Sequence, residues 1–126
     1  MEEKISFSFK KGDKITKSYD FKDVFEKGKG LGASTVALYF ILKESGNPRA
    51  GFIASKKISK KAVDRNRAKR LMREVFRLNR HKLVPCDIVF IARGRIKDAK
   101  YADVEKDFMF LVKKAGILKQ GRLKDV

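Results

Sequence analysis

The strongest constraint on the fold is a highly basic segment that also has the apolar period of an α-helix. Residues 56–82 hold twelve Lys or Arg against two acidic residues, so +10 of the net charge of +17 lies in about a fifth of the 126 residues. Apolar side chains recur there at i, i+3, i+4, i+7 and i+8, the spacing of a helix that rests on a core. These side chains are Ala68, Leu71, Met72, Val75 and Phe76. The pattern predicts a core-facing helix over residues 62–80.

The opposite side of this predicted helix is almost entirely cationic. Its outward positions are Asn66, Arg70, Arg73, Arg77 and Arg80, with Lys69 at the margin. A face that serves only solubility usually mixes charge signs. Like charges gathered on one face destabilise a folded chain unless a polyanion neutralises them. We therefore expect the face to bind a polyanion, and a merely solvated surface is the minor alternative.

Length and composition are those of one globular domain. A hydrophobic content of 43% with ten Phe indicates a substantial core, and no linker or internal repeat divides residues 1–126. Residues 1–17 are mostly polar and basic, which suggests a flexible basic arm. No apolar run approaches 18 residues and residues 1–11 are charged, so we expect neither a membrane span nor a signal peptide. A cytoplasmic location follows, and the single cysteine, Cys86, agrees with a reducing compartment.

The first half of the chain predicts a helix followed by two or three strands. A helix from Tyr19 to about Lys27 has Ser18 as a candidate N-cap and Gly28 as its stop. Residues 29–33 fit a short strand. Residues 34–44 fit a strand whose buried side is Val36, Leu38, Phe40 and Leu42. The turn signal at residues 46–48 predicts that residues 50–55 return as its antiparallel neighbour.

The second half predicts one central strand and a last helix. Residues 87–92 (DIVFIA) are continuously apolar after Asp87, as in a strand buried on both faces. From Tyr101 an apolar period marks an amphipathic helix that Gly116 ends. The predicted class is α/β (α+β): a two-layer sandwich with the helices on one side of a small sheet.

Several motifs then point to a family. The basic helix carries Val63-Asp64-Arg65-Asn66-Arg67-Ala68-Lys69-Arg70-Leu71-Met72-Arg73-Glu74, preceded by Arg49-x-Gly51 and Ser55-Lys56-Lys57 and followed by Asp87-x-Val89-x-Ile91-Ala92-Arg93. Together with Phe21-x-x-Val24-Phe25-x-x-Gly28, these motifs cover nearly the whole chain and closely resemble the protein subunit of bacterial ribonuclease P.

The resemblance implies both a fold and a function. The family's order is helix, three strands, helix, strand, helix, with a left-handed strand-helix-strand crossover, whereas such crossovers are almost always right-handed. The protein would join a catalytic RNA that removes the 5′ leader of precursor tRNA, and the RNA with bound Mg²⁺ would carry the chemistry. Many relatives have a glycine before the basic helix where this chain has Ser59-Lys60-Lys61, so Ser59 is a candidate N-cap there.

The resemblance assigns the basic helix to the catalytic RNA. The expected RNA-binding residues are Arg65, Asn66, Arg67, Lys69, Arg70 and Arg73, with a polycationic rim of Lys56, Lys57, Lys60 and Lys61. Arg offers a planar, bidentate contact to phosphate that Lys cannot copy. Asn66 can contact RNA or serve a local cap, and Arg67 can contact RNA or form a salt bridge with Glu74.

Three aromatic residues form the second expected site. In the family, aromatics at the positions of Phe21, Phe25 and Tyr39 line a cleft for the 5′ leader, where unpaired bases can stack. The alternative for the two Phe is a place in the core. Tyr39 shares its side of the strand with Thr35 and Lys43, which favours exposure.

Other chemistry is disfavoured. His81, Cys86 and Asp87 lack the spacing of a metal site or a nucleophile with its base, so we expect no catalytic residue and no metal ligand in the protein. Gly28, Gly30 and Gly32 do not match a nucleotide-binding loop. A non-catalytic ribosomal or RNA-chaperone protein is the alternative function, and a self-sufficient nuclease is disfavoured because the acidic residues are scattered.

Overall fold

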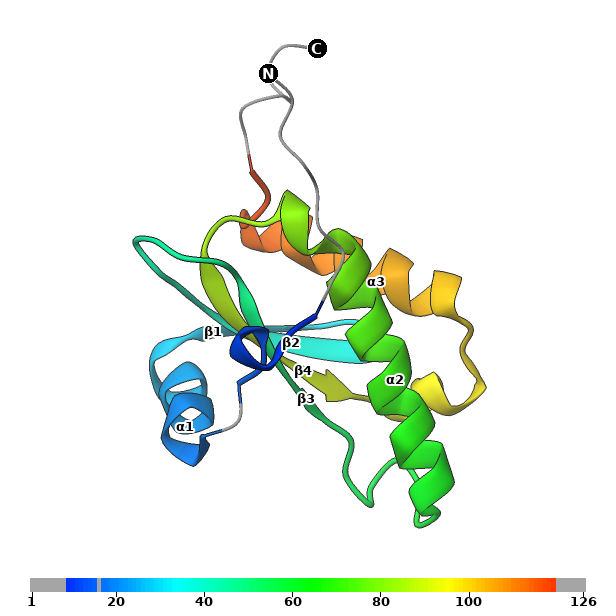
Figure 1. Ribbon diagram of the computed structural model, residues 1–126. Helices are drawn as coiled ribbons and strands as arrows, with labels where there is room; N and C mark the ends of the chain where they lie inside the picture. The colour runs from blue at the N-terminus through cyan, green and yellow to red at the C-terminus, as the bar shows by residue number, and fades with distance from the viewer. Residues whose placement is uncertain (1–8, 16, 120–126) are drawn as a thin grey trace, which may run out of the picture.

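The computed structural model describes residues 9–15 and 17–119 and builds them around a four-stranded sheet (Figure 1). The helices are α1 (Ser18–Lys27), α2 (Ala62–Asn79) and α3 (Tyr101–Ala115), and the strands are β1 (Lys29–Gly32), β2 (Val36–Leu42), β3 (Arg49–Ile53) and β4 (Cys86–Ala92). Three short 3₁₀ turns complete the described part: η1 (Lys11–Asp13), η2 (Arg80–Lys82) and η3 (Gly94–Asp98). The mixed α+β class and the order helix, three strands, helix, strand, helix are as predicted.

The strand order is β1-β2-β4-β3, which corrects the predicted hairpin. β4 pairs antiparallel with β2 and parallel with β3, so it separates the two strands that we expected to be neighbours. The physical reason is burial. Ile88, Val89 and Phe90 are fully buried on alternating faces, and a strand in the centre of a sheet is the one most readily covered on both faces. The turn before Pro48 therefore reverses the chain without pairing β2 to β3. The left hand of the β3-α2-β4 crossover stays an expectation of the resemblance.

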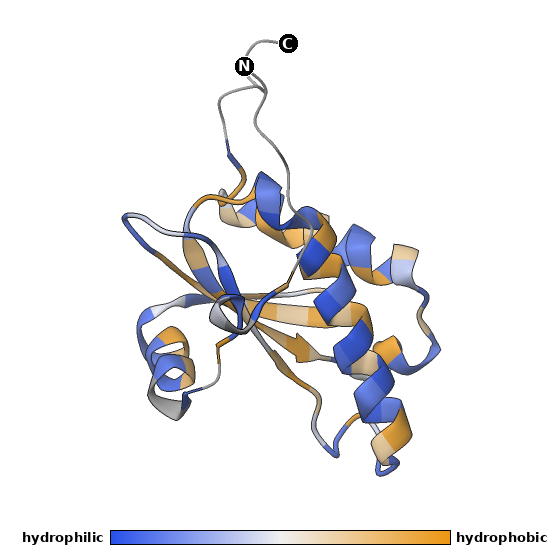
Figure 2. Cartoon of the chain, in the orientation of Figure 1, coloured by the Kyte–Doolittle hydropathy of each residue, from blue (hydrophilic) through white to orange (hydrophobic). Residues whose placement is uncertain are grey.

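The larger core lies between one face of the sheet and helices α2 and α3. Phe90 of β4 stacks on Phe108 of α3 at 5.3 Å between ring centroids and meets Phe76 of α2 edge-on at 6.2 Å. The strands at the centre of Figure 2 are largely orange, whereas α2 alternates between blue and orange along its length. Leu42, predicted in the buried set, is the last residue of β2 and is 59% exposed.

Helix α1 covers the opposite face of the sheet, so the prediction of helices on one side was wrong. Val24 of α1 packs with Val89 of β4 and Ile15 in a second buried cluster. Alternation along β4 explains both clusters, because Val89 and Ile91 point away from Ile88 and Phe90. The short α1 leaves part of this face accessible, including the half-buried Ile53 and Ile91.

Residues 9–15 are held along the edge of β3. Ile15 donates its backbone N–H to the Ala50 carbonyl at 2.8 Å, and Phe9 packs 5.9 Å from both Phe52 and Phe76. Asp13 forms an ion pair with Arg80 at 2.6 Å. Within the expected flexible arm of residues 1–17, the segment 9–15 thus packs on the fold, whereas residues 1–8 and 16 lie outside the described residues. Arg80, expected to face outward, instead anchors this segment.

The helix ends show which local predictions were accurate. Gly116 ends α3 at φ 74, the left-handed conformation that glycine adopts without strain. α1 begins at Ser18 itself, with Lys17 at the N-cap position, and the N-cap of α2 is Lys61 rather than Ser59. Among residues 9–15 and 17–119, no helix combines the length and the apolarity that crossing a bilayer requires.

Candidate RNA interface

Helix α2 is seated rigidly, which determines what it presents outward. Ala68, Met72, Val75 and Phe76 are completely or almost completely buried. The opposite side carries what we call the α2 cationic surface: Asn66, Lys69, Arg70 and Arg73. Asn66 and Arg70 are exposed, whereas Lys69 and Arg73 are partly buried. The predicted outward direction is confirmed for Asn66 and Arg70, and only in part for Lys69 and Arg73.

Arg73 is supported by an aromatic ring. Its guanidinium carbon lies 6.0 Å from the centroid of Phe52, within the range of a cation–π contact. This contact restrains the side chain while part of it remains accessible to solvent.

The turn before α2 is braced by hydrogen bonds rather than by a glycine. Ser59 donates its hydroxyl to Asp64 at 2.7 Å and accepts the Lys61 backbone N–H at 3.1 Å. Arg65 donates from Nη1 to the carbonyls of Ser59 and Lys60 at 3.0 and 2.9 Å. The side chain of Ser59 therefore organises the turn before α2. The four lysines of the predicted rim, Lys56, Lys57, Lys60 and Lys61, are all exposed around it.

Arg67 holds another part of the same chain. Its guanidinium donates to the carbonyls of Ile96, Lys97 and Ala99, the last at 2.6 Å from Nη2. The alternative salt bridge to Glu74 is not formed, because Arg77 donates to both oxygens of Glu74 at 2.7 Å. The hydrogen bond from Arg77 lowers the pKa of Glu74.

These bonds of Arg67 bring η3 against α2 and add cations that the sequence reasoning missed. Arg95, Lys97 and Lys100 are exposed on this segment. Their spacing shows no helix or strand face, so the only sequence signal was the local density of basic residues in 93–100. The tertiary contact extends the positive surface beyond α2.

The second candidate site lies on the α1 side of the sheet. Phe25 meets Tyr39 edge-on, with ring centroids 5.1 Å apart and planes at 73°. Phe25 is 38% exposed, and Phe21 and Tyr39 are partly buried. We call these three residues the aromatic surface. Phe21 and Tyr39 both pack against the small cluster around Val24, which supports the core alternative in part for Phe21, whereas the exposed Phe25 does not fit it.

The two surfaces lie on opposite faces of the sheet. α2 packs on the face of Phe90, whereas the aromatic surface lies on the face of Val89. Residues 54–61 leave the end of β3 and lead directly into α2, so the lysine rim lies between the two surfaces along the chain. The two surfaces therefore do not overlap.

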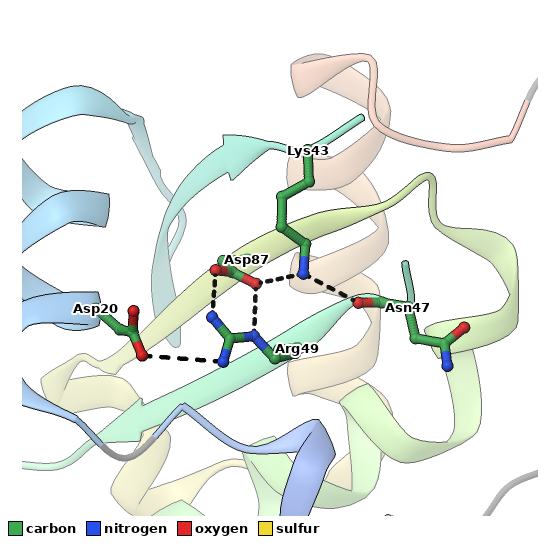
Figure 3. A network of polar contacts seen from close by, with 5 residues as sticks. All are labelled: Asp20, Lys43, Asn47, Arg49 and Asp87. Atoms are coloured by element: carbon green, nitrogen blue, oxygen red, sulfur yellow. Dashed lines mark hydrogen bonds and ion pairs between the residues drawn. The ribbon is translucent and has the colours of Figure 1, made fainter. Parts of the chain in front are cut away.

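An ion-pair network ties α1 to the sheet (Figure 3). Asp87 accepts from Arg49 at 3.0 and 2.8 Å and pairs with Lys43 at 3.1 Å, and Arg49 reaches Asp20 of α1 at 3.9 Å. Burial alone would raise the pKa of Asp87, but its bonds to Arg49 and Lys43 outweigh burial and lower it. Both carboxylate oxygens are thus engaged within the fold.

The groups next to this network are poorly suited to nucleophilic catalysis or to metal binding. Burial, with the nearby Asp87 charge, raises the pKa of the Cys86 thiol to about 12, so it is not a thiolate at neutral pH. Within the described residues, no group of three or more His, Cys, Asp or Glu is arranged to hold a metal ion.

A mixed α+β fold that presents a rigid cationic helix and a separate aromatic surface defines a nucleic-acid-binding protein. Comparisons with known proteins give the particular family. The family model described as Ribonuclease P matches residues 9–116. A ribonuclease P protein component from Clostridioides difficile is 39% identical over 115 residues, covering 90% of this chain and 98% of the relative. One from Clostridium botulinum (strain Loch Maree) is 40% identical over 109 residues, covering 85% and 97%.

Solved structures agree with these sequence relatives. The RNase P protein of Staphylococcus aureus matches with a TM-score of 0.76 and 29% identity over 85% of this chain and 98% of its own. The protein from Thermotoga maritima matches with a TM-score of 0.67 and 29% identity over 75% and 90%. The chain belongs to the ribonuclease P protein family. It is accordingly a protein subunit of ribonuclease P, the endonuclease that processes the 5′ ends of tRNA.

Proposed function

We propose that the α2 cationic surface, together with Arg65, Arg67 and the lysine rim, docks the catalytic RNA of ribonuclease P. The observation that carries this proposal is the exposure of Arg70 and Asn66 on a helix whose other side carries the buried Met72, Val75 and Phe76. A helix that is held by its buried side fixes the backbone from which these cations project, so binding phosphates requires ordering of side chains but not of the backbone. Arg67 acts indirectly in this proposal, because its guanidinium is bonded to the carbonyls that hold η3.

The aromatic surface is proposed to hold the 5′ leader of precursor tRNA. Single-stranded nucleotides expose their bases, and an aromatic ring stabilises each stacked base by about 1 to 3 kcal/mol. Tyr39 and Phe25 form one continuous edge-to-face pair with accessible surface, which supports this assignment. Because the surface lies on the other face of the sheet from α2, the leader and the catalytic RNA would not compete for it.

The chemical step is assigned to the RNA subunit with its divalent metal ions, Mg²⁺ among them. The protein would contribute affinity and substrate discrimination through the two surfaces, and it would require no nucleotide cofactor. Precursor tRNA is the proposed substrate partner, and the catalytic RNA is the proposed permanent partner.

Salt dependence tests the docking surface. Each phosphate contact that is lost should reduce the slope of log K against log salt by about 0.7 to 0.9. We expect Arg70→Ala and Arg73→Ala each to flatten the slope for the catalytic RNA. Lys22→Ala is the control, since Lys22 pairs with Glu26 on α1, on the other face of the sheet. Slopes equal to that of the unmodified protein for both α2 variants would refute the assignment.

Reconstitution separates this function from that of a ribosomal or RNA-chaperone protein. The protein is combined with the catalytic RNA at low magnesium, and cleavage of precursor tRNA is measured. We expect the protein to stimulate cleavage by the RNA and to show no cleavage alone. Cleavage by the protein alone, or no stimulation, would contradict the proposal.

A further inference from the structure

Gly30 lies directly beneath the ring of Tyr39. The two residues are opposite each other in the antiparallel β1–β2 pair, so their side-chain positions share one face of the sheet. A methyl group added at Gly30 would lie 2.6 Å from Cε2 and 2.8 Å from Cζ of Tyr39. Ordinary carbon contacts are about 3.5 to 4.0 Å, so the ring and a side chain cannot both occupy this place. The Tyr39 ring therefore packs directly against the backbone of Gly30, which has no side chain.

Gly51 has the same relationship to Phe21. It lies on β3 opposite Val89, and a methyl group there would lie 2.5 Å from Cε1 and 2.6 Å from Cζ of the Phe21 ring. Phe21 descends from α1, so this contact also determines how closely the first turns of α1 approach β3. Two of the three rings of the aromatic surface are thus seated on glycines of two different strands.

Backbone conformation does not explain these glycines. Among the described residues only Gly46 and Gly116 have positive φ, so an L-residue could adopt the backbone of Gly30 or Gly51. Glycine in a strand weakens it, and it commonly marks a close approach of another group. Not every glycine here has such a neighbour, since Gly12 has no atom within 4 Å of an added methyl group.

We propose that Gly30 and Gly51 are positioning residues for leader binding: they set the height and tilt of the Tyr39 and Phe21 rings on which bases stack. This inference rests on the proposed leader role of the aromatic surface. A side chain at Gly30 lifts the Tyr39 ring, which also breaks its edge contact with Phe25. The rings then present a different plane, although every aromatic residue is still there.

Binding to two RNAs measures the effect. Holoenzyme reconstituted with the catalytic RNA is titrated with precursor tRNA and with mature tRNA, and the ratio of the two affinities is the leader contribution. We expect Gly30→Ala and Gly51→Ala to reduce this ratio about 5- to 10-fold, the lower part of the loss expected for one stacked base. Affinity for mature tRNA and for the catalytic RNA should stay unchanged. Gly12→Ala is the matched control and should leave the ratio unchanged.

A double variant shows whether the glycine acts through the ring. Once Tyr39→Ala has removed the ring, adding Gly30→Ala should reduce the leader contribution no further. If Gly30→Ala folds poorly, the double variant should regain thermal stability, because the clash is with the ring. Failure to regain it, or additive losses in binding, would overturn the inference.

A measurement on the free protein checks the geometry itself. Protons above an aromatic ring resonate upfield, so the α-protons of Gly30 should be shifted upfield and should return toward ordinary positions in Tyr39→Ala. Unshifted Gly30 protons would overturn the inference.

The binding data distinguish failure of this inference from failure of the proposed function. If Tyr39→Ala leaves the leader contribution intact, the proposed leader role fails and this inference fails with it. If Tyr39→Ala reduces it and Gly30→Ala does not, only this inference fails.

Discussion

Arg49 and Asp87 lie opposite each other on the parallel strands β3 and β4 and form a two-pronged ion pair. Nε of Arg49 lies 3.0 Å from Oδ1 of Asp87, and Nη2 lies 2.8 Å from Oδ2. Arg49 also reaches Asp20, so the pair joins two strands and the helix that carries Phe21 and Phe25. The position of the aromatic surface on the sheet therefore depends in part on one buried carboxylate.

Asp87→Asn should destabilise the fold. The substitution removes the negative charge that the partly buried Arg49 and Lys43 share, and losing hydrogen bonds to a charged group costs about 2 kcal/mol. The free energy of unfolding in urea measures the loss. Asp23→Asn is the control, because Asp23 forms only an exposed pair with Lys27 at 3.9 Å, and its change should stay below about 0.5 kcal/mol. Equal changes for both variants would contradict the importance of the Asp87 network.

Acid should weaken the protein partly through the same residue. The folded-state pKa of Asp87 lies below its ordinary value of 3.8, so its stabilising contribution is fully present above that value. It is lost as the pH falls below 3.8 through the folded-state pKa. Stability measured against pH should therefore fall less steeply in Asp87→Asn. Some slope will remain, because the pKa values of Asp13, Glu74 and Glu105 are also lowered.

Arg67 and Arg70 should behave differently although both belong to the predicted RNA-binding set. Arg67→Ala removes the donors that hold three carbonyls near η3 and should lower the free energy of unfolding by about 1 to 3 kcal/mol. Arg70 is exposed, so Arg70→Ala should change stability by less than about 0.5 kcal/mol. Arg67→Lys should restore little, because one ammonium group cannot reach all three carbonyls as the planar guanidinium does. Identical thermal unfolding of the two alanine variants would show that the bonds of Arg67 contribute nothing.

Cys86 should report global unfolding. Its side chain is fully buried and its pKa is raised to about 12, so at pH 8 the native protein should react very slowly with a thiol reagent such as DTNB. Reaction should accelerate through the urea transition together with the loss of helical circular dichroism. Rapid labelling of the folded protein would mean that the Cys86 end of β4 opens locally.

Features that depend on neighbours in the chain were predictable. α2 follows from an apolar period of 3.6 residues, and the segment Ala62–Asn79 lies within two residues of the prediction. The burial of β4 follows from a run of apolar residues that no exposed strand would carry. The cationic side of α2 follows from the same period, because the burial of Met72 and Val75 forces Arg70 outward.

Features that depend on long-range packing were not predictable from local patterns. β4 lies between β2 and β3 because both of its faces are apolar and must be buried. The turn signal near Gly46 predicts only that the chain reverses, and it does not show which strand pairs with β2. Arg67 and Arg80 have the same chemistry as Arg70, and the helical period places all three on polar positions. Only the folded chain brings the carbonyls of residues 96–99 to Arg67 and the carboxylate of Asp13 to Arg80, because a long guanidinium side chain bonds whichever partner the packing of distant segments puts within its reach.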